Sequence, residues 1–435
     1  MSDGPDPHTR YRNQSTQSAR LAERAREVLP GGDTRSVTYH RPYPTFFTEA
    51  SGAQVTTADG EELLDFLNNY TQSVLGHAPG PVVEAACDRL ERGNDVAAPN
   101  EDIVELAERL VERVRSVERV RFTNSGTEAT MNAIRAAMAW TDRDRVLKVR
   151  GGYHGTHDTV EVAVGHEGVT AGIPSSVEQR VDAVRFNDVE ALKERFERSG
   201  DEYACFILEP IAGVAGMIPA TEAYLEAARD LTEATETVLI FDEVMSFRLA
   251  PGGAQERYGI EPDLTAFGKL IGGGLPVGAF GGRVDLMEQF DPETGVLNHS
   301  GTFNGNPATM AAGVALLDHF GADRIKTVNE RGDRLRDRLE SVGETADVPI
   351  RITGDGSLFQ IHFTDERVTD LKNSTAGDPP SEQLFLRLRN EGVLIAPRGM
   401  GNLSTALDQR DLDTFVDTFA TAVEAIGDSE TERDH

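Results

Sequence analysis

The sequence predicts an α/β protein with a mostly parallel sheet in a large domain and a smaller α+β domain. Between residues 76 and 325, helix-length amphipathic runs alternate with short apolar or β-branched runs. That alternation is typical of a parallel sheet covered by helices. After residue 325, helices are interleaved with short strands, which favours a second unit. A length of 435 residues is enough for two cores.

The N-terminal region, residues 1–75, is expected to give an arm and part of the small domain. Residues 1 to about 18 are polar and are expected to be flexible. A helix is expected over residues 19–28, and strands near residues 45–47 and 62–66.

The large domain is expected over residues 76–325, and residues 326–435 are expected to complete the small domain. The C-terminal region has strand patterns over residues 358–362 and 393–396, and its last residues, 428–435, are expected to be a frayed acidic tail. The strands expected in the large domain cover residues 117–123, 145–149, 204–208, 238–242, 264–267 and 277–281.

The chain is strongly acidic, with 73 acidic and 43 basic residues and a formal net charge of −30. Nucleic acid is not expected as a partner, because binding to a phosphate backbone needs a basic face. The acidic pattern resembles adaptation to high salt, so we expect a halophilic protein. No run approaches the roughly 20 apolar residues of a membrane helix. The polar N-terminus lacks a secretory signal, so we expect a cytoplasmic protein with no membrane partner.

An apolar strand pattern, residues 238–242, ends in Asp242, and Lys269 follows 27 residues later in a glycine-rich stretch, residues 266–274. Small neighbours let a flat cofactor approach the lysine amine. A buried lysine can be held neutral and nucleophilic enough to form a Schiff base. A carboxylate at a strand end can pair with a protonated pyridine nitrogen. Together the two residues indicate pyridoxal phosphate chemistry. The alternatives are a surface lysine at a turn and a carboxylate that caps a helix.

Two further strand ends carry polar or aromatic residues. Ligands of parallel sheets bind beyond the carboxyl ends of the strands. Ser125 and Thr127 stand where a strand ends and a helix of about 16 residues begins, so their hydroxyls and the backbone amides there are candidates for a phosphate. Ordinary helix capping is the alternative. Tyr153, in a Gly-Gly-Tyr-His-Gly loop, is a candidate for stacking on the cofactor ring, and its alternative is core packing.

The glycine-rich run 272–282 could instead belong to a dinucleotide-binding oxidoreductase. That motif should follow an early strand and open a helix. Pro276 and the strand pattern after it argue against such a loop.

With these motifs, the chain resembles the class III (ω-type) pyridoxal-phosphate aminotransferases of fold type I, from about residue 30 to Arg398. The resemblance implies a homodimer and an enzyme that acts on an amino acid and a keto acid. It also implies roles for individual residues. Ser125, Gly126 and Thr127 would hold the cofactor phosphate, Tyr153 would stack on the ring, Asp242 would pair with the pyridine nitrogen, Lys269 would form the Schiff base, Glu209 and Val244 would lie near the cofactor, and Thr302 would reach the phosphate of the neighbouring subunit.

Two subfamilies match different motifs. Glutamate-1-semialdehyde 2,1-aminomutases, which shift an amino group within one molecule, resemble the chain at residues 125–131 and 275–282. β-Amino-acid aminotransferases, such as those acting on β-phenylalanine, resemble it at residues 31–37, 299–304 and 397–399.

The chain departs from the aminomutase pattern at Arg35, which stands only three residues after Gly32, at residues 242–248, which are one residue shorter, and at residues 300–307. These departures favour the second subfamily, and the aminomutase stays as the alternative. A non-catalytic pyridoxal-phosphate-binding regulator is a remote alternative.

The second resemblance also implies substrate-binding residues. Arg35 and Arg398 match arginines that bind substrate carboxylates, and a planar guanidinium pairs well with a carboxylate. Tyr70 is a candidate for the side-chain pocket. The alternatives are structural ion pairs for the two arginines and core packing for the tyrosine. The expected reaction moves an amino group from an amino acid, with a β-amino acid favoured, to a keto acid such as 2-oxoglutarate or pyruvate in a ping-pong mechanism.

Overall fold

The computed structural model describes residues 6–164 and 171–431, with side chains up to residue 427. The chain divides into two compact units. We call residues 80–326 together with 369–373 the central unit, and residues 1–79, 327–368 and 374–435 the terminal unit. Within the described ranges, no helix is both long and apolar enough to cross a membrane.

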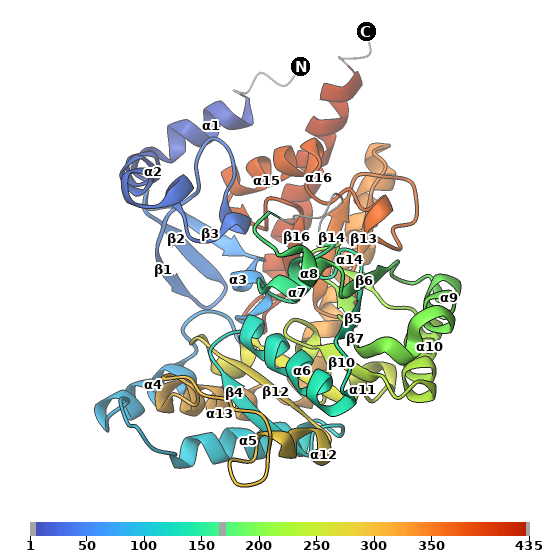
Figure 1. Ribbon diagram of the computed structural model, residues 1–435. Coiled ribbons are helices and arrows are strands. Elements are labelled where there is room, and N and C mark those ends of the chain that lie inside the picture. Colours follow the sequence, from blue (N-terminus) through green and yellow to red (C-terminus); the bar gives the residue numbers. More distant parts are fainter. Residues whose placement is uncertain (1–5, 165–170, 432–435) are drawn as a thin grey trace. The chain divides into compact units, whose positions relative to one another are not determined.

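The central unit is built on a seven-stranded sheet with the order β4-β12-β11-β10-β7-β5-β6 (Figure 1). The strands from β11 to β6 are parallel to their neighbours, whereas β12 is antiparallel to both β11 and β4. The predicted, mostly parallel sheet is therefore confirmed. The strands are β4 (Arg119–Thr123), β5 (Arg145–Val149), β6 (Val181–Val184), β7 (Tyr203–Leu208), β10 (Val238–Asp242), β11 (Leu264–Gly268) and β12 (Gly278–Gly282), with a separate hairpin of β8 (Ile211–Ala212) and β9 (Ile218–Pro219).

The reversed direction of β12 follows from its short connection to β11, which consists of residues 269–277. A parallel return needs a crossover of a dozen or more residues. Because β4 is also antiparallel to β12, it has the same direction as β11. The carboxyl ends of β4, β5, β7, β10 and β11 therefore all point to the same side of the sheet, which is the side where the strands end.

Helices pack on this sheet. α6 contacts β4, β7, β10, β11 and β12, and its buried residues are mostly alanines, which let a helix approach a sheet closely. The helices of the central unit are α4 (Gly80–Glu91), α5 (Glu101–Arg113), α6 (Gly126–Thr141), α7 (Asp158–Glu161), α8 (Ser175–Glu178), α9 (Val189–Ser199), α10 (Glu222–Ala234), α11 (Ala254–Tyr258), α12 (Val284–Met287) and α13 (Pro307–His319).

The terminal unit has α+β character and draws on both ends of the chain, as predicted. It contains a sheet with the order β1-β2-β3-β15 and another with the order β13-β14-β16. Its strands are β1 (Phe47–Ser51), β2 (Gln54–Thr57), β3 (Glu62–Asp65), β13 (Arg351–Thr353), β14 (Leu358–His362), β15 (Val393–Leu394) and β16 (Met400–Asn402). Its helices are α1 (Pro7–Gln14), α2 (Thr16–Val28), α3 (Asn68–Thr71), most of α14 (Ala322–Ala346), α15 (Pro379–Asn390) and α16 (Gln409–Thr431).

The N-terminal arm differs from its prediction. Residues expected to be flexible form α1 and the beginning of α2. The Asp6 side chain accepts hydrogen bonds from the backbone N–H groups of His8 and Thr9, and Pro7 occupies the first helical position. Both features start a helix. At the other end, α16 continues to Thr431, and the remainder of the expected acidic tail lies outside the described residues.

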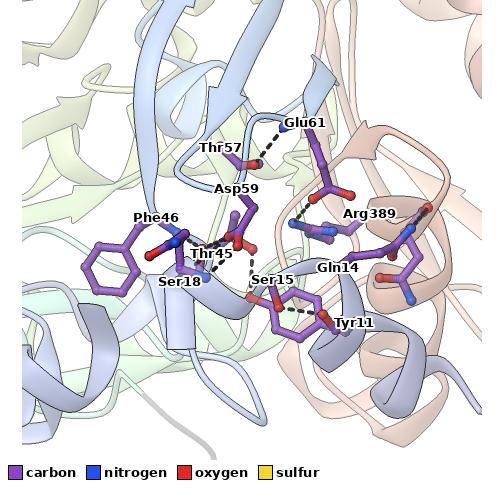
Figure 2. A network of polar contacts seen from close by, with 12 residues as sticks. Tyr11, Gln14, Ser15, Ser18, Thr45, Phe46, Thr57, Asp59, Glu61 and Arg389 are labelled. Atoms are coloured by element: carbon purple, nitrogen blue, oxygen red, sulfur yellow. Dashed lines mark hydrogen bonds and ion pairs between the residues drawn. The ribbon is translucent and has the colours of Figure 1, made fainter. Parts of the chain in front are cut away.

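A polar network fixes these N-terminal helices within the terminal unit (Figure 2). Asp59, in the turn between β2 and β3, accepts hydrogen bonds from the backbone N–H groups of Gln17 (2.6 Å) and Ser18 (3.1 Å) at the start of α2. The Tyr11 hydroxyl, on α1, donates to the backbone carbonyl of Tyr43 (2.9 Å). The arm is thus a packed part of the terminal unit.

Candidate active site

The predicted cofactor residues of the central unit follow strands that end at the same edge of the sheet. β7 is followed by Glu209, β10 ends in Asp242, and β11 is followed by Lys269. β4 leads into the start of α6, and β5 leads into the loop 151–155. The topology therefore brings together side chains that are far apart in sequence.

The Asp242 carboxylate is buried and held by two hydrogen bonds. Its Oδ1 accepts from the backbone N–H of Val244 (3.0 Å), and its Oδ2 lies 2.9 Å from Nδ1 of His154. Burial lowers the pKa of His154, more strongly than its bond to Asp242 raises it. A neutral imidazole that donates from Nδ1 orients the carboxylate without cancelling its charge.

Sequence reasoning missed His154, although it stands next to Tyr153 in the glycine-rich loop. The position of a histidine beside a strand-end aspartate could not be seen from the sequence, because 88 residues separate the two. In the described part of the chain, Nε2 of His154 is buried and makes no hydrogen bond.

Glu209 is a second buried carboxyl group in the cluster. Its two oxygens accept hydrogen bonds from the backbone N–H groups of Tyr153 (3.2 Å) and Gly213 (3.0 Å). Burial, and then the charge of Asp242, raise the pKa of Glu209 to about 8, while these two bonds and the charge of Lys269 oppose the rise. The raised pKa favours the protonated form of Glu209, and the two charges that shift it show that Glu209 lies near both Asp242 and Lys269.

Val244 joins the parts of the cluster by packing. A Cβ atom on Gly126, at the start of α6, would lie 3.1 Å from the Val244 side chain, and one on Gly268, just before Lys269, would lie 3.3 Å from it. Only glycine leaves room for this close approach on both sides. Lys269 is half-buried and has a left-handed backbone, with φ of 49°, a conformation that is uncommon outside glycine and marks a constrained site.

The start of α6 has the features of an anion site. Ser125 is the N-cap and accepts from the backbone N–H of Glu128 (3.2 Å), so the capping interpretation is confirmed for this residue. The backbone N–H groups of Gly126 and Thr127 have no hydrogen-bond acceptor among the described residues. A Cβ atom on Gly155 would lie 2.4 Å from Oγ1 of Thr127, so the 151–155 loop presses against this helix start. Unsatisfied N–H groups at a helix start attract a phosphate.

Tyr153 and Thr302 have exposed side chains. Tyr153 is 41% exposed, so it is not a core residue and its ring is accessible to a flat ligand. Thr302 is exposed, and it makes no hydrogen bond within the described ranges. The glycine-rich run after Lys269 leads into β12 rather than into a helix, which excludes the dinucleotide-loop alternative.

The predicted substrate residues meet in the terminal unit. The Arg35 guanidinium carbon lies 5.1 Å from the centre of the Tyr70 ring, and Nη1 of Arg35 donates to Oδ1 of Asn69 (2.9 Å). The pKa of Tyr70 is raised to about 12 by burial, which outweighs the nearby positive charges of Arg35 and Arg398, and the charge of Asp33 adds to the rise. Both arginines therefore lie close to Tyr70.

Neither arginine forms an ion pair with a carboxylate in the described residues, although the charge of Asp33 interacts with that of Arg35. Arg398 donates to the backbone carbonyl of Ala376 (3.3 Å), and neither it nor Arg35 forms an ion pair within the described residues. The ion-pair alternatives are therefore not supported. Two guanidinium groups that keep their charge beside one half-buried tyrosine are suited to bind carboxylates.

The class III aminotransferase family model matches residues 36–422. The chain belongs to the class III aminotransferases. It is 42% identical over 387 residues to a glutamate-1-semialdehyde 2,1-aminomutase of Methanothermobacter thermautotrophicus, covering 88% of this chain and 92% of that protein. It resembles the structure of an ω-transaminase from Sphaerobacter thermophilus, with 42% identity, a TM-score of 0.91, and coverage of 95% of this chain and 98% of the other. It also resembles a β-phenylalanine aminotransferase from Variovorax paradoxus, with 36% identity, a TM-score of 0.92, and coverage of 97% and 96%.

This family is one of enzymes that use pyridoxal phosphate, so the predicted enzyme class, fold type I and cofactor are confirmed. The residues present fit that cofactor. The open N–H groups at the start of α6 suit its phosphate, the accessible ring of Tyr153 suits its ring, the buried carboxylate of Asp242 suits its pyridine nitrogen, and the amine of Lys269 suits its aldehyde.

Proposed function

We propose that the protein transfers the amino group of a β-amino acid to a keto acid such as 2-oxoglutarate or pyruvate. The observation that carries this proposal is the pair of guanidinium groups of Arg35 and Arg398, which lie beside Tyr70 and form no ion pair within the described residues. The likeness to the β-phenylalanine aminotransferase supports it. The two arginines can bind the carboxylate of the amino donor and, in the second half of the reaction, the carboxylates of the keto acid.

The geometry supports the roles proposed for the cofactor residues. Ser125, Gly126 and Thr127 hold the phosphate, Tyr153 covers the ring, and Asp242, oriented by His154, pairs with the pyridine nitrogen. When bound, pyridoxal phosphate supplies an electron sink that acidifies the substrate carbon bearing the amino group.

Lys269 is the proposed acid and base. Its Nζ takes a proton from the substrate carbon that bears the amino group and later returns a proton. Glu209, whose pKa is raised to about 8 by burial and by the charge of Asp242, is proposed to donate a hydrogen bond near Asp242 in its protonated form, without adding a second negative charge. Arg35 and Arg398 orient the substrate through its carboxylate.

The second candidate is the glutamate-1-semialdehyde 2,1-aminomutase reaction, favoured by the 42% identity to the Methanothermobacter protein. The two candidates separate when the purified holoenzyme is given glutamate-1-semialdehyde alone, and separately β-phenylalanine with 2-oxoglutarate. We expect glutamate and the keto product in the second reaction. Formation of 5-aminolevulinate in the first reaction, with no turnover in the second, would establish the aminomutase instead.

The Arg398→Ala variant should raise the KM for carboxylate substrates by roughly 10- to 100-fold, the equivalent of a charge-assisted hydrogen bond. The kcat should fall much less, because Arg398 is proposed to act in binding. Arg12→Ala, on the exposed surface of α1, is the matched control. Unchanged KM values for both the donor and the keto acid would remove Arg398 from the site.

We also propose that the enzyme is a homodimer adapted to high salt. Exposed apolar side chains on α5, Val104 (54%) and Val111 (37%), and Phe303 (66%), next to Thr302, suit a subunit interface. Repulsion among acidic groups reaches further as salt falls, since the Debye length grows from about 3 Å at 1 M to about 30 Å at 0.01 M.

Sedimentation velocity and activity in dilute buffer and in molar salt test this proposal. We expect the dimer and the activity to be lost together at low salt. A fully active dimer in dilute buffer would contradict the adaptation to salt, and an active monomer in molar salt would contradict the dimer.

A further inference from the structure

The segment Asn68–Thr71, labelled α3, has an unusual backbone. Four consecutive residues that are not glycine have positive φ, namely Asn68 (46°), Asn69 (48°), Tyr70 (54°) and Thr71 (80°). A left-handed conformation costs such a residue roughly 1–2 kcal/mol. A left-handed turn of this length persists only where its surroundings impose it, and such strain is concentrated at functional sites.

The surroundings do impose it. Oδ1 of Asp65 accepts from the backbone N–H groups of Leu67 (2.7 Å) and Asn68 (2.9 Å), and Oδ2 of Asp65 lies 2.6 Å from Nε2 of His77. Asn402, on β16, closes the other side. Its backbone carbonyl accepts from the side-chain amide of Asn68 (2.9 Å), and its own side-chain amide donates to the backbone carbonyl of Leu67 (2.7 Å).

The left-handed turn makes two neighbouring side chains reach the same segment, residues 35–37. The Asn69 oxygen accepts from Nη1 of Arg35, and the Tyr70 ring lies beneath the Arg35 guanidinium. The Tyr70 hydroxyl donates to the carbonyl of Val37 (2.5 Å). In an extended strand, adjacent side chains point to opposite faces, so an ordinary strand could not make both contacts.

The acceptor in this arrangement is a neutral amide. A carboxylate at the same place would form an ion pair with Arg35 and would compete with a substrate carboxylate. The nearest acidic residue in sequence, Asp33, forms no ion pair with the Arg35 guanidinium, although the two charges interact. Its carboxylate accepts from the backbone N–H groups of Thr34 (2.6 Å) and Arg35 (3.1 Å) and from the Thr38 hydroxyl. The amide uses one of the five N–H donors of a guanidinium and adds no negative charge beside Arg35.

We propose that Asn69 is a positioning residue that selects substrates with a carboxylate, by orienting Arg35 without neutralising it. This inference rests on the proposed role of Arg35 in binding the carboxylate of the amino donor. It adds that the left-handed turn exists to place Asn69 and Tyr70 against the same guanidinium.

The Asn69→Asp variant tests this proposal. Aspartate has the same shape and also tolerates a left-handed backbone, so the turn should persist. We expect the KM for β-phenylalanine to rise about tenfold, as for the loss of a charge-assisted contact, with kcat within about twofold. The KM for 1-phenylethylamine, a donor without a carboxylate, should stay unchanged. An equal change for both donors, or no change for either, would overturn the proposal.

Two further variants separate orientation from charge. Asn69→Gly removes the amide but keeps the backbone, since glycine suits positive φ, and we expect a smaller rise in the same KM. Asn13→Asp makes the same chemical change on the exposed surface of α1 and should alter neither KM. Equal KM values in Asn69→Gly and the unmodified enzyme would show that the amide orients nothing.

A binding measurement keeps this test independent of the proposed function. The affinity of the holoenzyme for 3-phenylpropanoate, an unreactive carboxylate, can be measured by calorimetry. It should fall about tenfold in Asn69→Asp and stay the same in Asn13→Asp, even if β-phenylalanine is not a substrate. Unaltered affinity in Asn69→Asp would refute the role of Asn69. A missing turnover of β-phenylalanine, with the affinity lowered as expected, would refute only the proposed function.

Discussion

Replacing Lys269 with alanine should lower kcat by about 10⁴-fold or more, because the variant loses both the amine that carries the cofactor and the proposed acid and base. The absorbance band of pyridoxal phosphate bound through a lysine amine should disappear as well. The Lys193→Ala variant, on the exposed face of α9, is the matched control and should keep both the band and the activity.

A second lysine, Lys148, could also be considered as the residue that carries the cofactor, and the prediction distinguishes between the two. Lys148 lies on β5, is fully buried, and has a pKa lowered by burial to about 8, so it meets the usual electrostatic criterion for a reactive amine. Its Nζ, however, donates to the backbone carbonyls of Val160 (2.5 Å) and Val162 (2.9 Å). Those bonds give Lys148 a structural role.

Borohydride reduction of the holoenzyme, followed by peptide mapping, separates the two lysines. The cofactor should be found on the peptide that contains Lys269. Recovery of the cofactor on the peptide that contains Lys148, or a Lys269→Ala enzyme with an unaltered band, would contradict the assignment. We expect the cofactor on Lys269 because this residue follows the carboxyl end of β11, on the side of the sheet where Glu209 and Asp242 also lie.

The fold could be predicted from sequence wherever burial dominates the pattern. Fully buried strands such as β7 and β10 are continuous apolar runs, and their positions in the sequence are evident. The edge strand β6 was not predicted, because it is only four residues long, its two central residues are only partly buried, and one of these is the polar Asp182. The helix α1 was not predicted either, because it buries only Tyr11. The signal that could have revealed it is the Asp6-Pro7 pair, which starts a helix without any apolar periodicity.

Candidate site residues could be predicted where the cofactor chemistry calls for a particular residue type. They could not be predicted where only a contact in the folded chain identifies them. Lys269 and Asp242 have a recognisable setting in the sequence. His154 and Asn69 have none, since they are marked only by their contacts with Asp242 and Arg35, from which 88 and 34 positions separate them in sequence. The sequence also contains nothing that announces four left-handed residues in succession, because two asparagines would fit many turns.

The second large effect is expected in the polar network that fixes the N-terminal helices (Figure 2). Arg389, on α15, has a fully buried side chain, and its Nη2 donates to Oε2 of Glu61 (2.6 Å). Its guanidinium also lies over the Tyr11 ring, 4.8 Å from the centre. Nε and Nη1 of Arg389 make no hydrogen bond within the described residues, so Glu61 supplies the one ion pair that this buried cation has there.

Glu61→Ala should therefore lower the free energy of unfolding by about 3 kcal/mol, the low end for a broken buried ion pair, since the Glu61 side chain is 28% exposed. Urea denaturation followed by circular dichroism measures this change. Glu391→Ala, which breaks the exposed ion pair with Arg10 in the same unit, should cost less than about 1 kcal/mol.

The order of the variants identifies the physical cause. If the cost comes from leaving a cation buried without its partner, Arg389→Met should destabilise less than Glu61→Ala, since methionine leaves no charge inside and fills part of the space. Adding Arg389→Met to Glu61→Ala should then recover stability, which a double-mutant cycle would show as a coupling between the two sites. If Arg389→Met is instead the more destabilising single change, packing of the guanidinium on Tyr11 outweighs the ion pair, and the N-terminal helices are held mainly by that stacked contact.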